Sequence, residues 1–157
     1  MSNRHRARRL ALQALCCLDV QGQKTADLVA QFIDDSQDPP ETRAAARKLL
    51  SEAEAARDES DRTLTRHAKH WDLSRLALVD RNILRLAVAE MRGGQTPPKV
   101  VITEAIRLAS EFSSGESPRF VNGILDAVMK EMLASGPPGA AGNGDTSSPE
   151  RQQPSAP

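Results

Sequence analysis

The sequence predicts an all-α fold, and three observations support this prediction. Apolar residues recur at three- and four-residue spacing in successive segments, which places them on one face of a helix. No segment shows the two-residue alternation that is typical of a half-buried strand. The chain has one Trp, three Phe and no Tyr, so its core must consist of Leu, Ile, Val and Ala, which suits closely packed helices.

Length and charge indicate one domain with an anionic partner at one end. The 157 residues suit a single domain and a tail. Basic and acidic residues number 21 each, yet the first ten residues hold four arginines and no acid, which suggests an anionic partner there. No segment could span a membrane and no apolar segment follows the arginines as in a signal peptide, so we expect a cytoplasmic protein without membrane contact.

The first two helices are expected at residues 4–20 and 25–35. The first has one apolar face and ends at Gly22; that face consists of Ala7, Leu10, Ala11, Ala14, Leu15 and Leu18. The adjacent Cys16 and Cys17 point in different directions on a helix, so they are predicted to pack and not to form a disulfide. Thr25 is the expected N-cap of the second helix, whose predicted buried residues are Leu28, Val29, Phe32 and Ile33.

Residues 41–70 are predicted to form a long, charged helix that breaks near residues 58–61. The restart after Asp38 follows from Pro39 and Pro40, because proline is tolerated in the first helical turn. The next stretch, 71–91, is the longest apolar-rich run and is predicted to form the central helix, since it is apolar on more than one side. A buried carboxylate is costly unless it is paired, so Asp80 either serves the first turn of a helix that begins near Val79 or lies where a partner covers it.

Two further helices and a tail complete the chain. Gly93 and Gly94 end the central helix, Pro97-Pro98 opens the helix that runs to Phe112, and residues 117–132 form the last one. Gly123 lies inside this last helix, which predicts that another backbone passes close to it. From residue 135 the composition is rich in Gly, Pro and Ser, so we divide the chain into a helical domain at 1–134 and a disordered tail at 135–157.

Catalytic and metal-binding patterns are lacking in the sequence. His67, His70 and Asp72 offer at most half a metal site, and no phosphate-loop, dinucleotide, nucleophile-elbow or CxxC motif is present. We expect Glu104 to be an exposed helix charge. The chain is therefore predicted not to be an enzyme and to need no cofactor and no metal.

The arginine-rich start of the first helix is the polar feature that points to a function. Guanidinium groups spaced along a helix can contact a phosphate backbone and unpaired bases; a solubilising basic end is the alternative. Because this segment has no aromatic residue for base stacking, Phe120 beside Arg119 is the candidate for that role, with a core position as its alternative.

Four ordered blocks resemble the bacterial transcription antitermination factor NusB family over about residues 4–132. They are RHRARRLALQAL, WDLSRLALVDRNILRLAVAEM, VVITEAIRLASEF and SPRFVNGILDAV. The resemblance implies a seven-helix domain with two three-helix groups around a central helix, without catalysis or a cofactor. It also implies binding of the boxA element of ribosomal RNA leader transcripts with the NusE ribosomal protein, in an RNA polymerase elongation complex with other Nus factors.

The resemblance also assigns residues to two surfaces. The implied RNA-binding residues are Arg4, Arg6, Arg8, Gln13, Arg119 and Phe120, and Asp80 is implied at the NusE surface. Two departures from the family pattern stand out: Cys16 replaces a usual tyrosine, and Ala77-Leu78 replaces a common Ser-Pro helix start. Two alternatives remain: a domain related to the RNA-binding part of some ribosomal RNA cytosine methyltransferases, and a self-associating homodimer.

Overall fold

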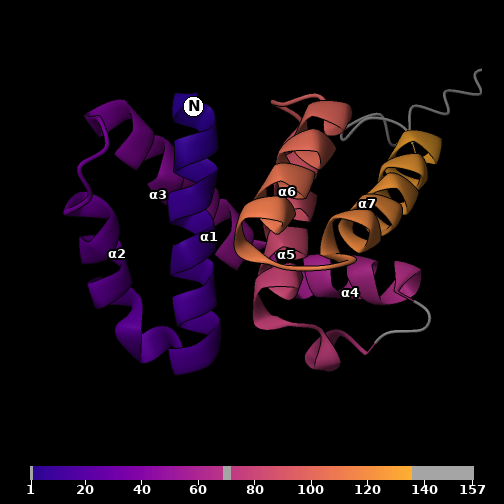
Figure 1. Cartoon of the computed structure of the whole chain (residues 1–157), viewed down its shortest axis with the longest axis horizontal. Helices are drawn as coiled ribbons and strands as arrows, with labels where there is room; N and C mark the ends of the chain where they lie inside the picture. Colours follow the sequence, from indigo (N-terminus) through magenta and orange to yellow (C-terminus); the bar gives the residue numbers. More distant parts are fainter. Residues whose placement is uncertain (1, 69–71, 136–157) are drawn as a thin grey trace, which may run out of the picture.

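The computed structural model describes residues 2–68 and 72–135, and this part of the chain folds into seven α-helices without a strand (Figure 1). The all-α prediction is thereby confirmed. The helices are α1 (Asn3–Gln21), α2 (Ala26–Asp34), α3 (Pro40–Ala55), α4 (Arg57–His67), α5 (Leu78–Gly93), α6 (Pro98–Phe112) and α7 (Ser117–Ala134). Residues 136–157, which hold nearly all of the expected tail, lie outside the described residues. No described helix has the length and apolar character needed to cross a membrane.

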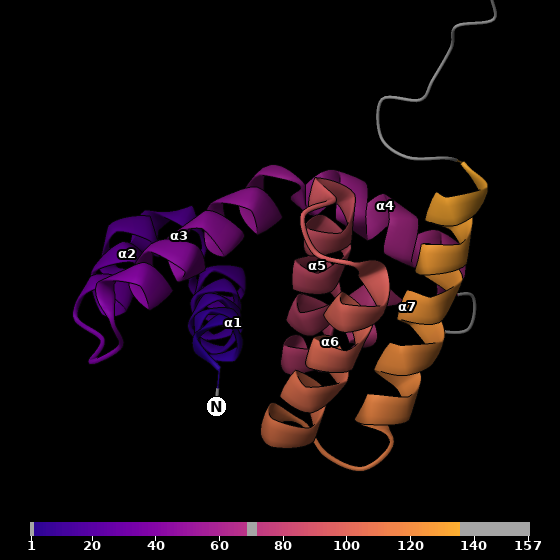
Figure 2. The same ribbon diagram turned by 90° about the horizontal axis from the view of Figure 1, so that it is seen from above.

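The helices form two groups of three around α5, as expected. α1, α2 and α3 pack together on one side, whereas α4, α6 and α7 surround the other side of α5 (Figure 2). Both α1 and α3 also contact α5 directly. The larger apolar core follows α5 and includes its Ile83, Leu84 and Val88, while a smaller core between α1, α2 and α3 centres on Ile33 and Ala46.

Helix ends follow from local chemistry. The Ser2 hydroxyl accepts a hydrogen bond from the His5 backbone N–H and so caps α1. Gly94 adopts φ 71°, the left-handed conformation that glycine tolerates, and its N–H donates to the Met91 carbonyl to end α5. Pro98 begins α6 at a position where the missing N–H costs nothing.

Two predicted boundaries have shifted. The break in the long charged segment lies at Ala56 and not at residues 58–61. The acidic side chains of Asp58 and Glu59 instead occupy the first turn of α4, where the helix dipole favours negative charge. The central stretch is a short 3-10 turn at Leu73–Arg75 followed by α5 from Leu78. This confirms the alternative in which Asp80 belongs to the first turn of the helix.

Three predictions about side chains were wrong. Leu28 and Phe32 were expected to be buried, but they are 67% and 48% exposed because no described element covers the outer side of α2. Only Val29 and Ile33 of that helix are buried. At Gly123 an added Cβ would meet no atom within 4 Å, so no backbone of the described chain passes close to this position.

Candidate functional site

The rotation of α1 is fixed by an ion pair on the side that faces α5. Arg8 is only 5% exposed. Its Nε donates to Glu90 Oε2 at 3.0 Å and its Nη2 donates to Glu90 Oε1 at 2.5 Å. This bidentate ion pair fixes the orientation of the planar guanidinium. Arg8 was predicted to contact RNA, but here its charge is buried and paired inside the fold, so that contact stays a prediction.

His5 ties the same helix to α6. The ring is fully buried, with Nδ1 2.7 Å from Glu104 Oε2 and Nε2 2.5 Å from Glu111 Oε1. Burial alone acts to raise the pKa of Glu104, but the hydrogen bonds from His5 and Arg107 outweigh it and lower that pKa below its usual value. The expectation that Glu104 is a solvated charge was therefore wrong.

With Arg8 and His5 turned inward, a different set of polar side chains follows another face of α1. Arg6, Arg9 and Gln13 follow one another at spacings of three and four residues, and we call them the α1 stripe. Arg6 is 45% exposed at its side chain and has a long, 3.9 Å contact with Asp38; such an exposed pair is weak. Gln13 is exposed.

Arg9 was not among the predicted RNA residues, yet it connects α1 to the end of α6. Its Nε lies 3.1 Å from Glu111 Oε2, and its guanidinium lies 5.4 Å from the centre of the Phe112 ring. The regular spacing of Arg6, Arg9 and Gln13 was the sequence signal that could have included it.

Arg4 faces another direction. It is exposed and lines a cavity of about 230 Å³ together with Ala45 and Lys48 of α3 and Gln95 and Thr96 of the α5–α6 connection. Arg8, four residues after Arg4, lines the same cavity. Two of the predicted RNA residues, Arg4 and Arg8, thus share one side of α1, whereas exposed Arg6 lies on another.

Asp80 and Phe120, assigned to different surfaces by the resemblance, line the same cavity. It has a volume of about 230 Å³ between the start of α5 and the start of α7, and Arg75, Glu116 and Ser117 also line it. The Ser117 hydroxyl donates to Asp80 Oδ2 at 2.9 Å. Oδ1 of Asp80 is buried without a hydrogen-bond partner among the described residues, so this oxygen could accept a donor from a bound partner.

The α6–α7 connection lies between this cavity and the α1 stripe. Ser113, the residue after Phe112, donates from its hydroxyl to the Ser117 hydroxyl at 2.9 Å, which in turn reaches Asp80. Arg119 projects from the same helix start and is 88% exposed at its side chain, with a long contact to Glu116. Arg9 and the Phe120 cavity are thus linked through a single short connection, whereas Arg4 and Arg6 do not line that cavity.

The carboxylate of Asp19 near the end of α1 holds α1 against α4 and α5. It accepts hydrogen bonds from Arg81, Asn82 and Arg85 at 2.7–3.1 Å and lies 3.3 Å from Arg57. Burial acts to raise the pKa of Asp19, but these donors and the positive charges lower it below its ordinary value.

Beside this carboxylate, burial and the Asp19 charge raise the pKa of the Cys16 thiol to about 11. The Cys16 thiol therefore stays protonated at neutral pH.

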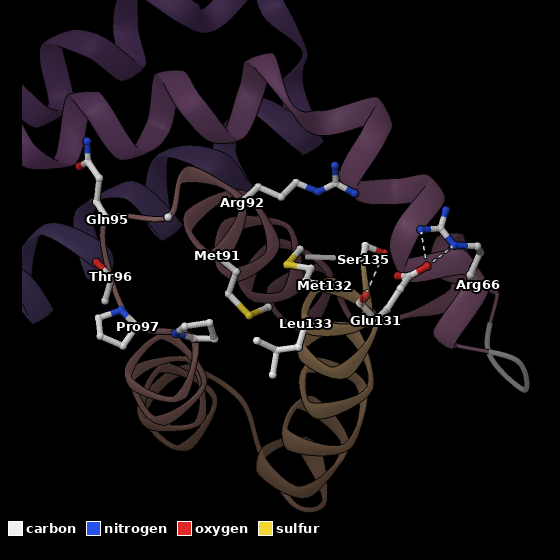
Figure 3. A pocket seen from close by; sticks show the side chains of 12 residues that line it. Arg66, Met91, Arg92, Gln95, Thr96, Pro97, Glu131, Met132, Leu133 and Ser135 are labelled. Atoms are coloured by element: carbon white, nitrogen blue, oxygen red, sulfur yellow. Dashed lines mark hydrogen bonds and ion pairs between the residues drawn. The ribbon is translucent and has the colours of Figure 1, made fainter. Parts of the chain in front are cut away.

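A larger cavity of about 590 Å³ lies at the opposite end of the helices (Figure 3). Met91, Met132 and Leu133 form much of its apolar wall, and the guanidinium of Arg66 at its edge is bonded to Glu131. None of the predicted RNA or partner residues lines it.

Metal coordination finds no support in the geometry. His67 Nε2 lies 2.9 Å from Glu131 Oε2, and His70 lies outside the described residues. Across residues 2–68 and 72–135, no group of three or more His, Cys, Asp or Glu side chains could hold a metal ion.

Comparison with known proteins shows one family over most of the chain. The model of the NusB family matches residues 5–130. The transcription antitermination protein NusB of Solibacter usitatus is 46% identical over 134 residues, which cover 84% of this chain and 92% of that protein.

Solved structures of the same family have the same fold. A T. maritima NusB structure is 30% identical with a TM-score of 0.73, and the match covers 83% of this chain and 93% of that one. A crystal structure of the antitermination factors NusB and NusE in complex with dsRNA contains a chain that is 28% identical, with a TM-score of 0.74 and coverage of 84% and 99%.

Proposed function

This chain belongs to the NusB family of transcription antitermination proteins, and from that premise we propose that it binds boxA RNA of ribosomal RNA leader transcripts together with the NusE ribosomal protein. The bound pair would join other Nus factors on the RNA polymerase elongation complex and promote transcription of ribosomal RNA operons. The observation that carries the proposal is the α1 stripe, in which exposed Arg6 and Gln13 lie on either side of half-buried Arg9. The related structure of NusB and NusE with dsRNA supports it.

The RNA part of the proposal rests on arginines that remain available for phosphates. Arg4 and Arg6 are exposed, and Arg119 extends the positive surface at the start of α7. Each phosphate contact releases counterions, so the logarithm of the affinity falls with the logarithm of the salt concentration by about 0.7 per contact for a single strand.

A titration of labelled boxA RNA tests this part. Replacing Arg4 and Arg6 together by alanine should weaken binding and reduce the salt slope by about 1.4, since about two contacts are lost. Arg62→Ala, which removes an exposed arginine from α4, is the matched control and should change neither quantity by a comparable amount. Equal affinity and an equal slope in the double variant would remove the RNA assignment from α1.

The protein part of the proposal rests on Asp80 and its cavity. A buried carboxylate oxygen without a partner costs stability, and a donor from NusE would satisfy it. Asp80→Asn keeps the shape and an acceptor for Ser117 but removes the charge, so we expect weaker binding of NusE and unchanged binding of boxA RNA alone. Unchanged NusE affinity, measured by calorimetry, would contradict this assignment.

A further inference from the structure

A groove between α1 and α2 contains side chains that neither the core nor the proposed phosphate contacts use. It has a volume of about 430 Å³, within the range of about 300–1,000 Å³ typical of small-ligand sites. We call it the α1–α2 groove; its lining residues are Gln13, Ala14, Cys17, Gln21, Thr25, Leu28, Val29 and Phe32. None of these side chains carries a formal charge, so the groove suits a neutral, partly apolar group.

The lining combines an aromatic ring with side-chain amides. Phe32 is 48% exposed although it lies beside buried Val29 and Ile33. Gln13 and Gln21 contribute amides that have no hydrogen-bond partner among the residues that the structure describes. An aromatic ring can stack on any base, and an amide offers both a donor and an acceptor to a base edge. The Thr25 hydroxyl already donates to the Gly22 carbonyl, so it could only accept a hydrogen bond from a base.

The groove is continuous with the α1 stripe, and this continuity favours RNA as its occupant. Gln13 belongs to both surfaces, and Arg6 lies seven residues before it, about 10.5 Å along the helix at 1.5 Å per residue. α2 runs beside α1 (Figure 1), and Arg6 faces Asp38 beyond the end of α2. A strand whose phosphates contact Arg6 can therefore place a nearby base between Gln13 and Phe32.

We propose that the α1–α2 groove is a nucleobase subsite, in which one unpaired base of single-stranded RNA stacks on Phe32 and hydrogen-bonds to the Gln13 amide. This inference rests on the proposed RNA binding and adds a second, sequence-reading contact to it. Phosphate contacts position a strand without reading its sequence, whereas contacts to a base edge can distinguish one base from another. An apolar segment of a protein is the rival occupant, because exposed Leu28 and Phe32 would also suit one.

The experiment measures the affinity of the full chain for labelled boxA RNA across a range of salt concentrations. Phe32→Leu removes the ring but retains apolar bulk at an exposed position. It should weaken binding about 5- to 150-fold, the equivalent of one lost stacking contact, without changing the salt slope, because no phosphate contact is lost. Phe32→Tyr keeps a ring and should bind like the unmodified chain.

A matched control and an altered RNA locate the contact. Val20→Ala truncates an exposed apolar residue that lies on α1 and does not line the groove, and it should leave the affinity unchanged. Removing single bases from the RNA should reveal one position whose loss weakens binding as much as Phe32→Leu does. Combining that abasic RNA with Phe32→Leu should add little further loss, since both changes remove the same contact.

Failure of this inference can be told apart from failure of the proposed function. If the unmodified chain binds RNA and the Arg4 and Arg6 double variant flattens the salt slope, but Phe32→Leu binds normally, the nucleobase subsite is refuted and RNA binding stands. Loss of NusE affinity alone in Phe32→Leu also refutes the subsite and identifies a protein occupant. If the unmodified chain does not bind boxA RNA, both proposals are overturned.

Discussion

Replacement of Arg8 by alanine is expected to destabilise the fold. Arg8 and Glu90 are 6% and 10% exposed at their side chains and are joined by two hydrogen bonds. Removing one partner of such a buried pair leaves the other charge unpaired, which typically costs about 3–5 kcal/mol. Since domains are stable by about 5–15 kcal/mol, the loss is a large fraction of the total. It corresponds to a decrease in melting temperature of roughly 10–20 °C.

Urea denaturation of four variants tests this structural role. Arg8→Met alone leaves Glu90 unpaired and should be strongly destabilised. Glu90→Met should be destabilised as well, because it leaves Arg8 with only a long, 4.0 Å contact to Glu104. The double variant replaces both charges by apolar side chains of similar length, so most of the stability should return. Replacement of Arg6, which is exposed and has only a long ion pair, is the matched control and should cost less than about 1 kcal/mol.

The RNA affinity of the double variant decides between the two roles of Arg8. Binding of boxA RNA with an unchanged salt slope is expected, because no phosphate contact is lost. An Arg8→Met protein that unfolds like the unmodified chain, but binds RNA weakly and with a flatter slope, would show that Arg8 contacts RNA and that the reasoning from burial is incorrect.

Three further changes follow from the same structure. The free energy of unfolding should fall below about pH 4, because the folded-state pKa of Asp19 is lowered. Such a carboxyl contributes its full stabilisation above its unfolded pKa of about 3.9 and loses it as the pH falls through the folded pKa. Urea unfolding between pH 6 and pH 2 should therefore show a smaller loss of stability in Asp19→Asn than in the unmodified chain. Cys16 should react with iodoacetamide at pH 8 at least ~100-fold more slowly in the folded chain than in urea, measured in a Cys17→Ser variant. The reason is that its raised pKa of about 11 leaves little of the reactive thiolate. Equal rates of modification, measured by mass spectrometry, would contradict the burial of this thiol. Gly123→Ala should stabilise the chain by about 0.5–1 kcal/mol, because the added Cβ meets open space within a helix; a lower urea midpoint would show that the position is crowded.

The helices could be predicted from sequence because their signals are local. Apolar spacing and the Gly and Pro boundaries located α1, α6 and α7 to within a few residues. The break lies at Ala56, ahead of the predicted residues 58–61, and the acidic side chains of Asp58 and Glu59 form the first turn of the next helix. Local sequence could not distinguish these two uses of the same acidic residues.

The surface was harder to predict because exposure depends on distant partners. The apolar spacing of α2 correctly located its helix, but burial of Phe32 required a neighbour that the described fold does not supply. Conversely, Glu104 lies 99 positions from His5, the residue with which it shares a hydrogen bond. Helical periodicity indicates which side chains share a face and not which face the rest of the chain covers.

Polar contacts fix the rotation of α1 about its axis and so determine which way the α1 stripe faces. Apolar packing of α1 against α3 leaves some freedom of rotation, since the hydrophobic effect is not directional. Arg8 on Glu90, His5 on Glu104 and Asp19 on the arginines of α4 and α5 remove that freedom, because hydrogen bonds between charged groups require defined geometry. Three residues from the polar part of α1 thus orient Arg6 and Gln13 outward. Changes at Arg8 should therefore affect RNA binding only through the position of α1, whereas changes at Arg6 should affect it directly.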